Sequence, residues 1–153
     1  MLSWLGGVMR GETSLAKLRA EAAQSTGMMG RMQLARALAS AGNLDEATDA
    51  YSCPWEHMLE HEPAMVGVRF SFMLAEIGDL VARHPPARAK FATLRDAAAP
   101  QPESASASFD DWVALNKALG EPEKTLQWFD RERECLASKP SSPRCWNEPW
   151  FRC

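Results

Sequence analysis

The stretch GRMQLARALASAGNLDEATDAY, residues 30–51, decides the expected fold. Its apolar residues recur at helical spacing until Gly42 and Asn43 interrupt the pattern, and glycine is common just past the end of a helix. Acidic residues follow at once, and they suit the positive end of a new helix dipole. The stretch therefore predicts a helix over Met28–Ala41, a tight turn, and a second helix beginning at Leu44.

Outward from this stretch, the same signals predict more helices and no strand. Pro54 lacks an amide hydrogen and predicts a kink in the helix that begins at Leu44. Pro63 and the pair Pro85-Pro86 suit the first turns of later helices, whereas the small, polar stretch 98–107 is typical of a loop. No strand-like alternation or hairpin turn is present. The other expected helices cover residues 14–25, 63–77, 87–97, 108–120 and 121–137.

A turn of similar sequence occurs three times, at Gly42, Gly78 and Gly120. Each is followed by a helix in which a small residue stands four positions before an aromatic one. The small residue lets two helices approach closely, and the aromatic ring fills the space one turn later. The three pairs are Ala47 and Tyr51, Ala87 and Phe91, and Thr125 and Phe129.

This pattern resembles the tetratricopeptide repeat (TPR) family. The stretch 30–51 is most similar to the family signature, the segment FDDWVALNKALGEPEKTLQWF (residues 109–129) is less so, and the segment around Gly78 departs from it beyond that glycine. The turn glycines are 36 and 42 residues apart, against a family period of about 34. The matching positions in the first segment are Leu34, Ala35, Leu38, Gly42, Leu44, Ala47 and Tyr51; the others contribute Phe70, Ser71, Leu74 and Gly78, and Phe109, Trp112, Val113, Gly120, Thr125 and Phe129.

The resemblance implies an all-α fold of about seven helices, in which antiparallel hairpins stack as a short solenoid. A single domain is expected over residues 1–153. It would comprise an N-terminal segment with one helix (1–27), three hairpins (28–139) and an irregular, aromatic C-terminal tail (140–153).

The resemblance also implies a non-enzymatic scaffold without a cofactor, which binds a partner peptide or helix in a concave groove. Methionine, phenylalanine and two arginines at the transferred positions suit a partly apolar, acidic or C-terminal peptide. The alternative is that the methionines pack against the first helix or the tail, and that the arginines are merely solvated. The transferred positions are Met29, Met32, Gln33, Arg36, Met65, Val68, Arg69, Phe72, Ala107, Asp110, Asp111 and Ala114.

Cys53, His57 and His61 are spaced four residues apart on one helix face, and thiolate and imidazole are zinc ligands. They support an alternative, a small metal- or thiol-dependent protein. Against it, residues eight apart on a straight helix are separated by about 12 Å, too far for one ion. A polar rim beside a buried cysteine is therefore the preferred interpretation, with no metal.

Composition limits the kind of partner. The 17 lysines and arginines against 20 acidic residues give a formal charge of −3, which argues against a nucleic-acid binder. No apolar stretch is long enough to span a membrane. The N-terminus does not resemble a secretory signal, which predicts a cytoplasmic location with reduced thiols. The repeat explains part of the content of 24 alanines, because some stand where helices must approach.

The tail carries three large aromatic residues, Trp146, Trp150 and Phe151, between Cys145 and Cys153. Such side chains are costly to leave exposed. We expect them to cover the open end of the stack or to bind a partner. A further alternative is a self-associating structural protein, in which these exposed aromatic residues form the interface of a homodimer. In an oxidising compartment the two cysteines could close a small disulfide loop.

Overall fold

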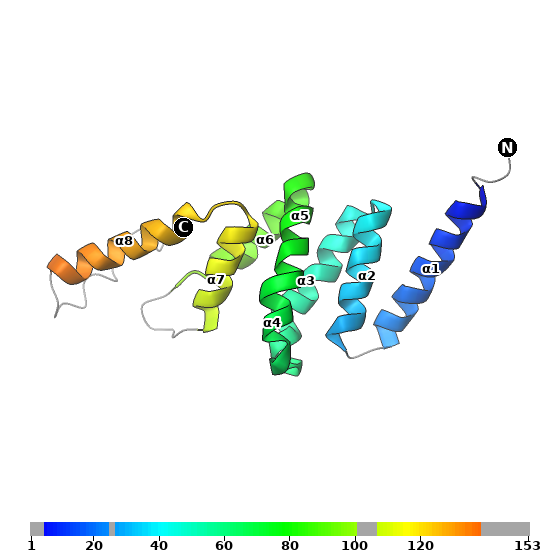
Figure 1. Ribbon diagram of the computed structural model, residues 1–153, viewed down its shortest axis with the longest axis horizontal. Helices are drawn as coiled ribbons and strands as arrows, with labels where there is room; N and C mark the ends of the chain where they lie inside the picture. The colour runs from blue at the N-terminus through cyan, green and yellow to red at the C-terminus, as the bar shows by residue number, and fades with distance from the viewer. Residues whose placement is uncertain (1–4, 25–26, 101–106, 139–153) are drawn as a thin grey trace. The chain divides into compact units, whose positions relative to one another are not determined.

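The computed structural model describes residues 5–24, 27–100 and 107–138. These residues form helices joined by short turns, with no strand among them, so the all-helical prediction is confirmed there (Figure 1). The segment from Pro63 to Arg83 is helical throughout, and counting it as one helix gives seven in the described chain. The elements are α1 (Leu5–Gln24), α2 (Met28–Ala41), α3 (Leu44–His61), a 3-10 turn (Pro63–Met65), α4 (Val66–Val68), a π-helical segment (Arg69–Met73), α5 (Leu74–Arg83), α6 (Pro85–Ala97), α7 (Ala107–Ala118) and α8 (Glu123–Ser138).

The helix boundaries follow the sequence signals closely around the central stretch. Helix α2 has the predicted bounds, and α3 begins at the predicted Leu44. Helix α1 begins at Leu5, well before the predicted start near Ser14, because Gly6 and Gly7 do not interrupt it. The predictions for residues 139–153, including both tail cysteines and the tail aromatics, fall outside the described residues.

Two of the three turn glycines close a helix in the same way. Gly42 and Gly120 have φ angles of 83° and 70°, in the left-handed region that glycine adopts without a steric penalty. After each of them a backbone amide reaches back to a carbonyl five residues earlier, Asn43 to Leu38 at 2.9 Å and Glu121 to Asn116 at 2.8 Å. This is the Schellman closure of a helix C-terminus.

The turn predicted at Gly78 is wrong. Gly78 lies inside α5, which continues to Arg83 before the chain turns at His84. The helix continues because its buried stripe does so on both sides of the glycine, with Ile77 before it and Leu80 after it, and this packing outweighs the low helix propensity of one glycine.

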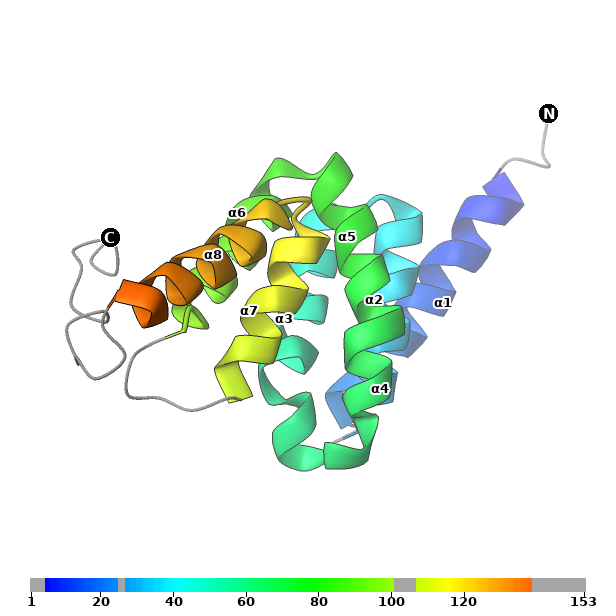
Figure 2. The same cartoon turned by 60° about the vertical axis from the view of Figure 1, so that its left-hand side comes forward.

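The contacts of the chain group into two compact units, residues 1–90 and residues 91–153, where the sequence predicts one domain. In the first unit, α2 and α3 form an antiparallel hairpin, and the α4–α5 segment runs in the same direction as α2 (Figure 1; Figure 2 turns the view). The core of this unit consists of fully buried side chains from these helices. The main members are Met32, Ala35, Leu38, Ala47, Tyr51, Met58, Met73, Ile77 and Leu80.

Of the three predicted pairs of a small and an aromatic residue, two are buried and the third is not. Ala47 and Tyr51 are at most 1% exposed, and Ala87 and Phe91 are fully buried, as close helix packing requires. The third pair does not have this role, because Phe129 is 51% exposed. Thr125 instead accepts a hydrogen bond from the Asn116 side chain at 3.1 Å.

In the second unit, α7 carries a row of buried apolar residues. Trp112, Leu115 and Leu119 follow helical spacing and are buried. Trp112 also belongs to an aromatic cluster between α7 and α8, in which the ring centroids of Phe109 and Trp128 lie 4.9 Å apart.

Candidate functional site

The predicted groove residues of the first unit fall into two groups. Some are at the surface: Met29 and Gln33 on α2 are exposed, and Phe72 in the π-helical segment is 66% exposed. Met65 and Val68 are half-buried. These five positions therefore present side chains that a partner can reach.

Met32 and Arg69 are core residues, and the prediction that they line a groove is wrong. Met32 is fully buried because it lies on the face of α2 that also carries Met28 and Ala35, one helical turn to either side. Arg69 is 4% exposed. Arg69 begins a π-helical segment, in which the number of residues per turn, and hence the outward face, differs from that of a regular helix.

The Arg69 guanidinium joins the π-helical segment to α3. Its Nε and Nη2 donate hydrogen bonds to the Trp55 carbonyl oxygen, at 2.9 and 2.6 Å. Its central carbon lies 4.0 Å from the centroid of the Trp55 ring and 5.1 Å from that of Phe70. The planar cation therefore has polar and aromatic partners inside the unit, and it is not available to a peptide carboxylate.

Arg36 is also held within the unit. Its Nε donates to Oε1 of Glu76 on α5 at 2.5 Å, while the Tyr51 hydroxyl on α3 donates to the other oxygen of the same carboxylate at 3.0 Å. Burial, together with the Glu76 carboxylate, raises the pKa of Tyr51 above its usual range, so the hydroxyl remains a donor. Glu76 thus connects α2, α3 and α5.

Large apolar side chains are exposed on two helical segments of the first unit. They are Met29 at 39%, Val66 at 47% and Phe72 at 66%, and we call these three side chains the apolar surface. All three belong to α2 or to the segment 66–73, the two helical segments predicted to line the groove. Val66 is not among the positions that the repeat resemblance implies.

The ion pair between Arg36 and Glu76 aligns α2 with the α4–α5 segment, and so relates the levels of the three residues of the apolar surface. Because α2 and the α4–α5 segment run in the same direction, residues at equal distance before this pair lie at similar levels (Figure 1). Met29 is seven residues before Arg36, and Phe72 and Val66 are four and ten residues before Glu76. By this residue count, Met29 lies at a level between Phe72 and Val66.

The three candidate metal ligands do not converge. Cys53 accepts a hydrogen bond from Nη1 of Arg31 at 3.1 Å, and Nδ1 of His57 lies 3.2 Å from Oε2 of Glu60. His61 is exposed at the end of α3. Among the described residues no group of three histidine, cysteine or acidic side chains could hold an ion.

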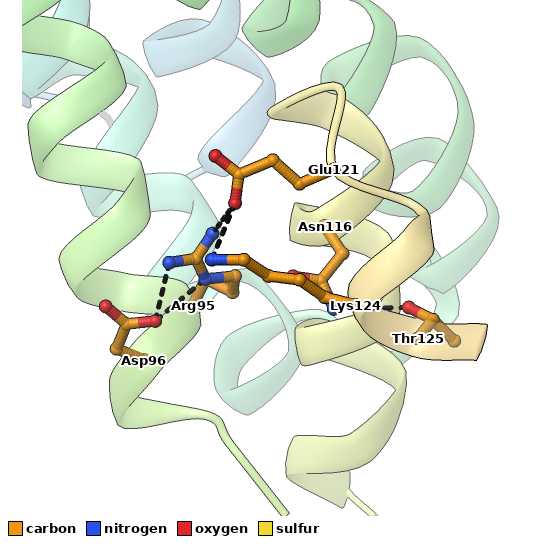
Figure 3. A network of polar contacts seen from close by, with 6 residues as sticks. All are labelled: Arg95, Asp96, Asn116, Glu121, Lys124 and Thr125. Carbon is orange, nitrogen blue, oxygen red and sulfur yellow. Dashed lines mark hydrogen bonds and ion pairs between the residues drawn. The ribbon is translucent and has the colours of Figure 1, made fainter. Parts of the chain in front are cut away.

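In the second unit, a buried arginine organises a polar network (Figure 3). Arg95, with 7% of its side chain exposed, pairs with Asp96 at 2.7 Å and with Glu121, which also pairs with Lys124 at 2.8 Å. Beside it, Asn116 is fully buried, and its Oδ1 has no hydrogen-bond partner. Of the predicted groove residues in this unit, Asp110 is exposed, Asp111 is half-buried and Ala114 is buried, while the Ala107 side chain lies outside the described set.

We expect the network to make the stability of the second unit depend on pH. Lys124, with Arg95 beside it, holds the pKa of the Glu121 carboxyl below its ordinary value near 4.5. A depressed carboxyl pKa stabilises the fold above the unfolded-state value, and this contribution is lost as the pH falls through the folded-state value. We expect Glu121→Gln to lower stability at pH 7 but to reduce the further loss on acidification. Urea denaturation at pH 7 and pH 4 measures both, and an equal acid loss in the two proteins would contradict the assignment.

Comparison with protein families, with characterised proteins and with solved structures finds no match for this chain. Within the residues that the structure describes, no helix is both long and apolar enough to cross a membrane. The functional argument therefore depends on the surfaces and cavities of the chain itself.

Proposed function

We propose that the first unit is a protein-interaction module that binds a peptide or helix of a partner protein through the apolar surface. The observation that carries the proposal is the location of Met29, Val66 and Phe72 on the two segments predicted to line a groove. Exposed apolar side chains that gather in one region are typical of binding sites, whereas isolated ones are common everywhere.

The proposal keeps the expected TPR-like arrangement for the helices of this unit. The antiparallel α2–α3 hairpin, the direction of the following helical segment and the buried pair Ala47 and Tyr51 support it. In such a stack the first helix of each hairpin lines the binding face, and under this proposal α2 and the segment 66–73 would have that position.

The chemistry of the partner differs from the sequence-based expectation. Arg69 is buried against Trp55 and is not available to a peptide carboxylate, and Arg36, with 42% of its side chain exposed, already pairs with Glu76 through its Nε. Recognition then rests on apolar contacts. We expect a partner segment with apolar anchors, spaced as on one face of a helix, in preference to an acidic tail.

Selection from a displayed library of random peptides tests the function. We expect the full chain to enrich sequences with apolar residues at positions i, i+3 or i+4, and i+7, without an excess of acidic residues. A selection that enriches acidic or carboxyl-terminal motifs, or no sequence at all, would contradict the proposal.

A further inference from the structure

A second feature of the first unit, separate from the apolar surface, is a cavity of about 310 Å³ bordered by α1, α2 and α3. Its walls include the apolar side chains Ala22, Leu34 and Ala50. Arg31 and Cys53 also line it, and they come from α2 and α3. The cavity is large enough for a small organic molecule rather than only for water.

Arg31 is the unusual member of this lining. Its Nη1 donates to the Cys53 sulfur at 3.1 Å, yet its Nε is shielded from solvent and has no hydrogen-bond partner. Among the described residues no carboxylate lies within ion-pair distance of this guanidinium. A thiol sulfur is a weak acceptor, and a guanidinium carries five N–H donors, so the cation is poorly satisfied by the protein.

The other charged residues that line the cavity do not provide Arg31 with a carboxylate partner. Arg19 is already paired with Glu46, with Nη2 to Oε2 at 2.7 Å. Asp49 also lines the cavity but is exposed and makes no ion pair with Arg31. Its negative charge on the cavity wall disfavours anions of higher charge more than singly charged ones.

We propose that this cavity binds a small monocarboxylate with a compact apolar body. The carboxylate accepts hydrogen bonds from the terminal Nη groups of the Arg31 guanidinium, because these two groups match the two oxygens of a carboxylate. The apolar body lies against Ala22, Leu34 and Ala50. Cys53 acts as a positioning residue, since its sulfur holds the guanidinium beside the cavity.

Titration of the full chain with benzoate tests this site, with benzamide as the uncharged molecule of the same shape and inorganic phosphate as a more highly charged anion. We expect benzoate to shift the Arg31 Nε–H signal in a nitrogen-15 NMR spectrum and to raise the melting temperature, and benzamide and phosphate to do neither. Arg31→Gln should weaken benzoate binding by at least about tenfold, which is the loss of one charge-assisted interaction.

Two further variants keep the test decisive. Arg83→Gln removes an exposed arginine on α5 that does not line the cavity, and it should leave benzoate binding unchanged. Ala23→Leu fills the cavity from α1 without changing a charge, so it should abolish binding even if Arg31→Gln fails to fold. Equal binding of benzoate and benzamide, or benzoate binding that survives Ala23→Leu, would overturn the proposal.

Discussion

Replacing Arg69 by alanine is expected to lower the free energy of unfolding of the first unit by about 3 kcal/mol. Hydrogen bonds from a charged group contribute about 1.5–3 kcal/mol, and a desolvated cation–π contact adds to them. Arg69 makes two such bonds to the Trp55 carbonyl and lies over the Trp55 ring, while only 4% exposed. Its removal also leaves that carbonyl without this donor inside the unit.

Urea denaturation, together with hydrogen exchange of the α3 and α5 amides, measures this loss. Arg83→Ala is the control, because Arg83 is an exposed arginine of the same unit and its replacement should change stability by less than about 0.5 kcal/mol. Arg69→Lys retains the charge but not the planar fork, and should fall between the two. A loss below about 1 kcal/mol for Arg69→Ala would show that the contacts of Arg69 with Trp55 do not stabilise the first unit.

The part of the fold that the sequence predicts well is the part fixed by local rules. The bounds of α2 follow from helical spacing and from a glycine that closes the helix with a positive φ angle. Ala47 and Tyr51 are recognisable as a core pair because a small residue and an aromatic one, one turn apart, must face a neighbouring helix. Such signals depend only on residues close in the sequence.

The candidate site depends on longer-range relations, which a linear pattern does not contain. The face that Arg69 presents depends on a π-helical segment, and no local residue pattern indicated that segment. Arg36 was expected at a groove surface, but its partner Glu76 is 40 residues away in the sequence. Arg31 and Cys53 meet across 22 residues, so the cavity beside them was not predicted. Among the exposed apolar residues, Phe72 was predicted from the repeat pattern and Val66 was not.

Phe72 is expected to be the strongest single determinant of partner binding. Its side chain is 66% exposed without a partner, so covering it on binding removes more apolar surface from water than Met29 or Val66 can. Aromatic residues near the centre of an interface often account for 2 kcal/mol or more of the binding free energy. Phe72→Asp removes this contact and places a charge in an apolar interface, so we expect the Kd of a selected peptide to rise at least about thirtyfold.

Isothermal titration of one selected peptide against matched variants measures this effect. Leu126→Asp is the control, because Leu126 is a 65% exposed apolar residue on α8 in the second unit. It makes the same change in charge at similar exposure, and the peptide should bind it as it binds the original chain. Both variants should keep the original melting temperature within about 2 °C, since neither replaced side chain is buried. If the two substitutions weaken binding equally, the apolar surface is not the peptide site, because a charge at any exposed apolar position would then have the same effect.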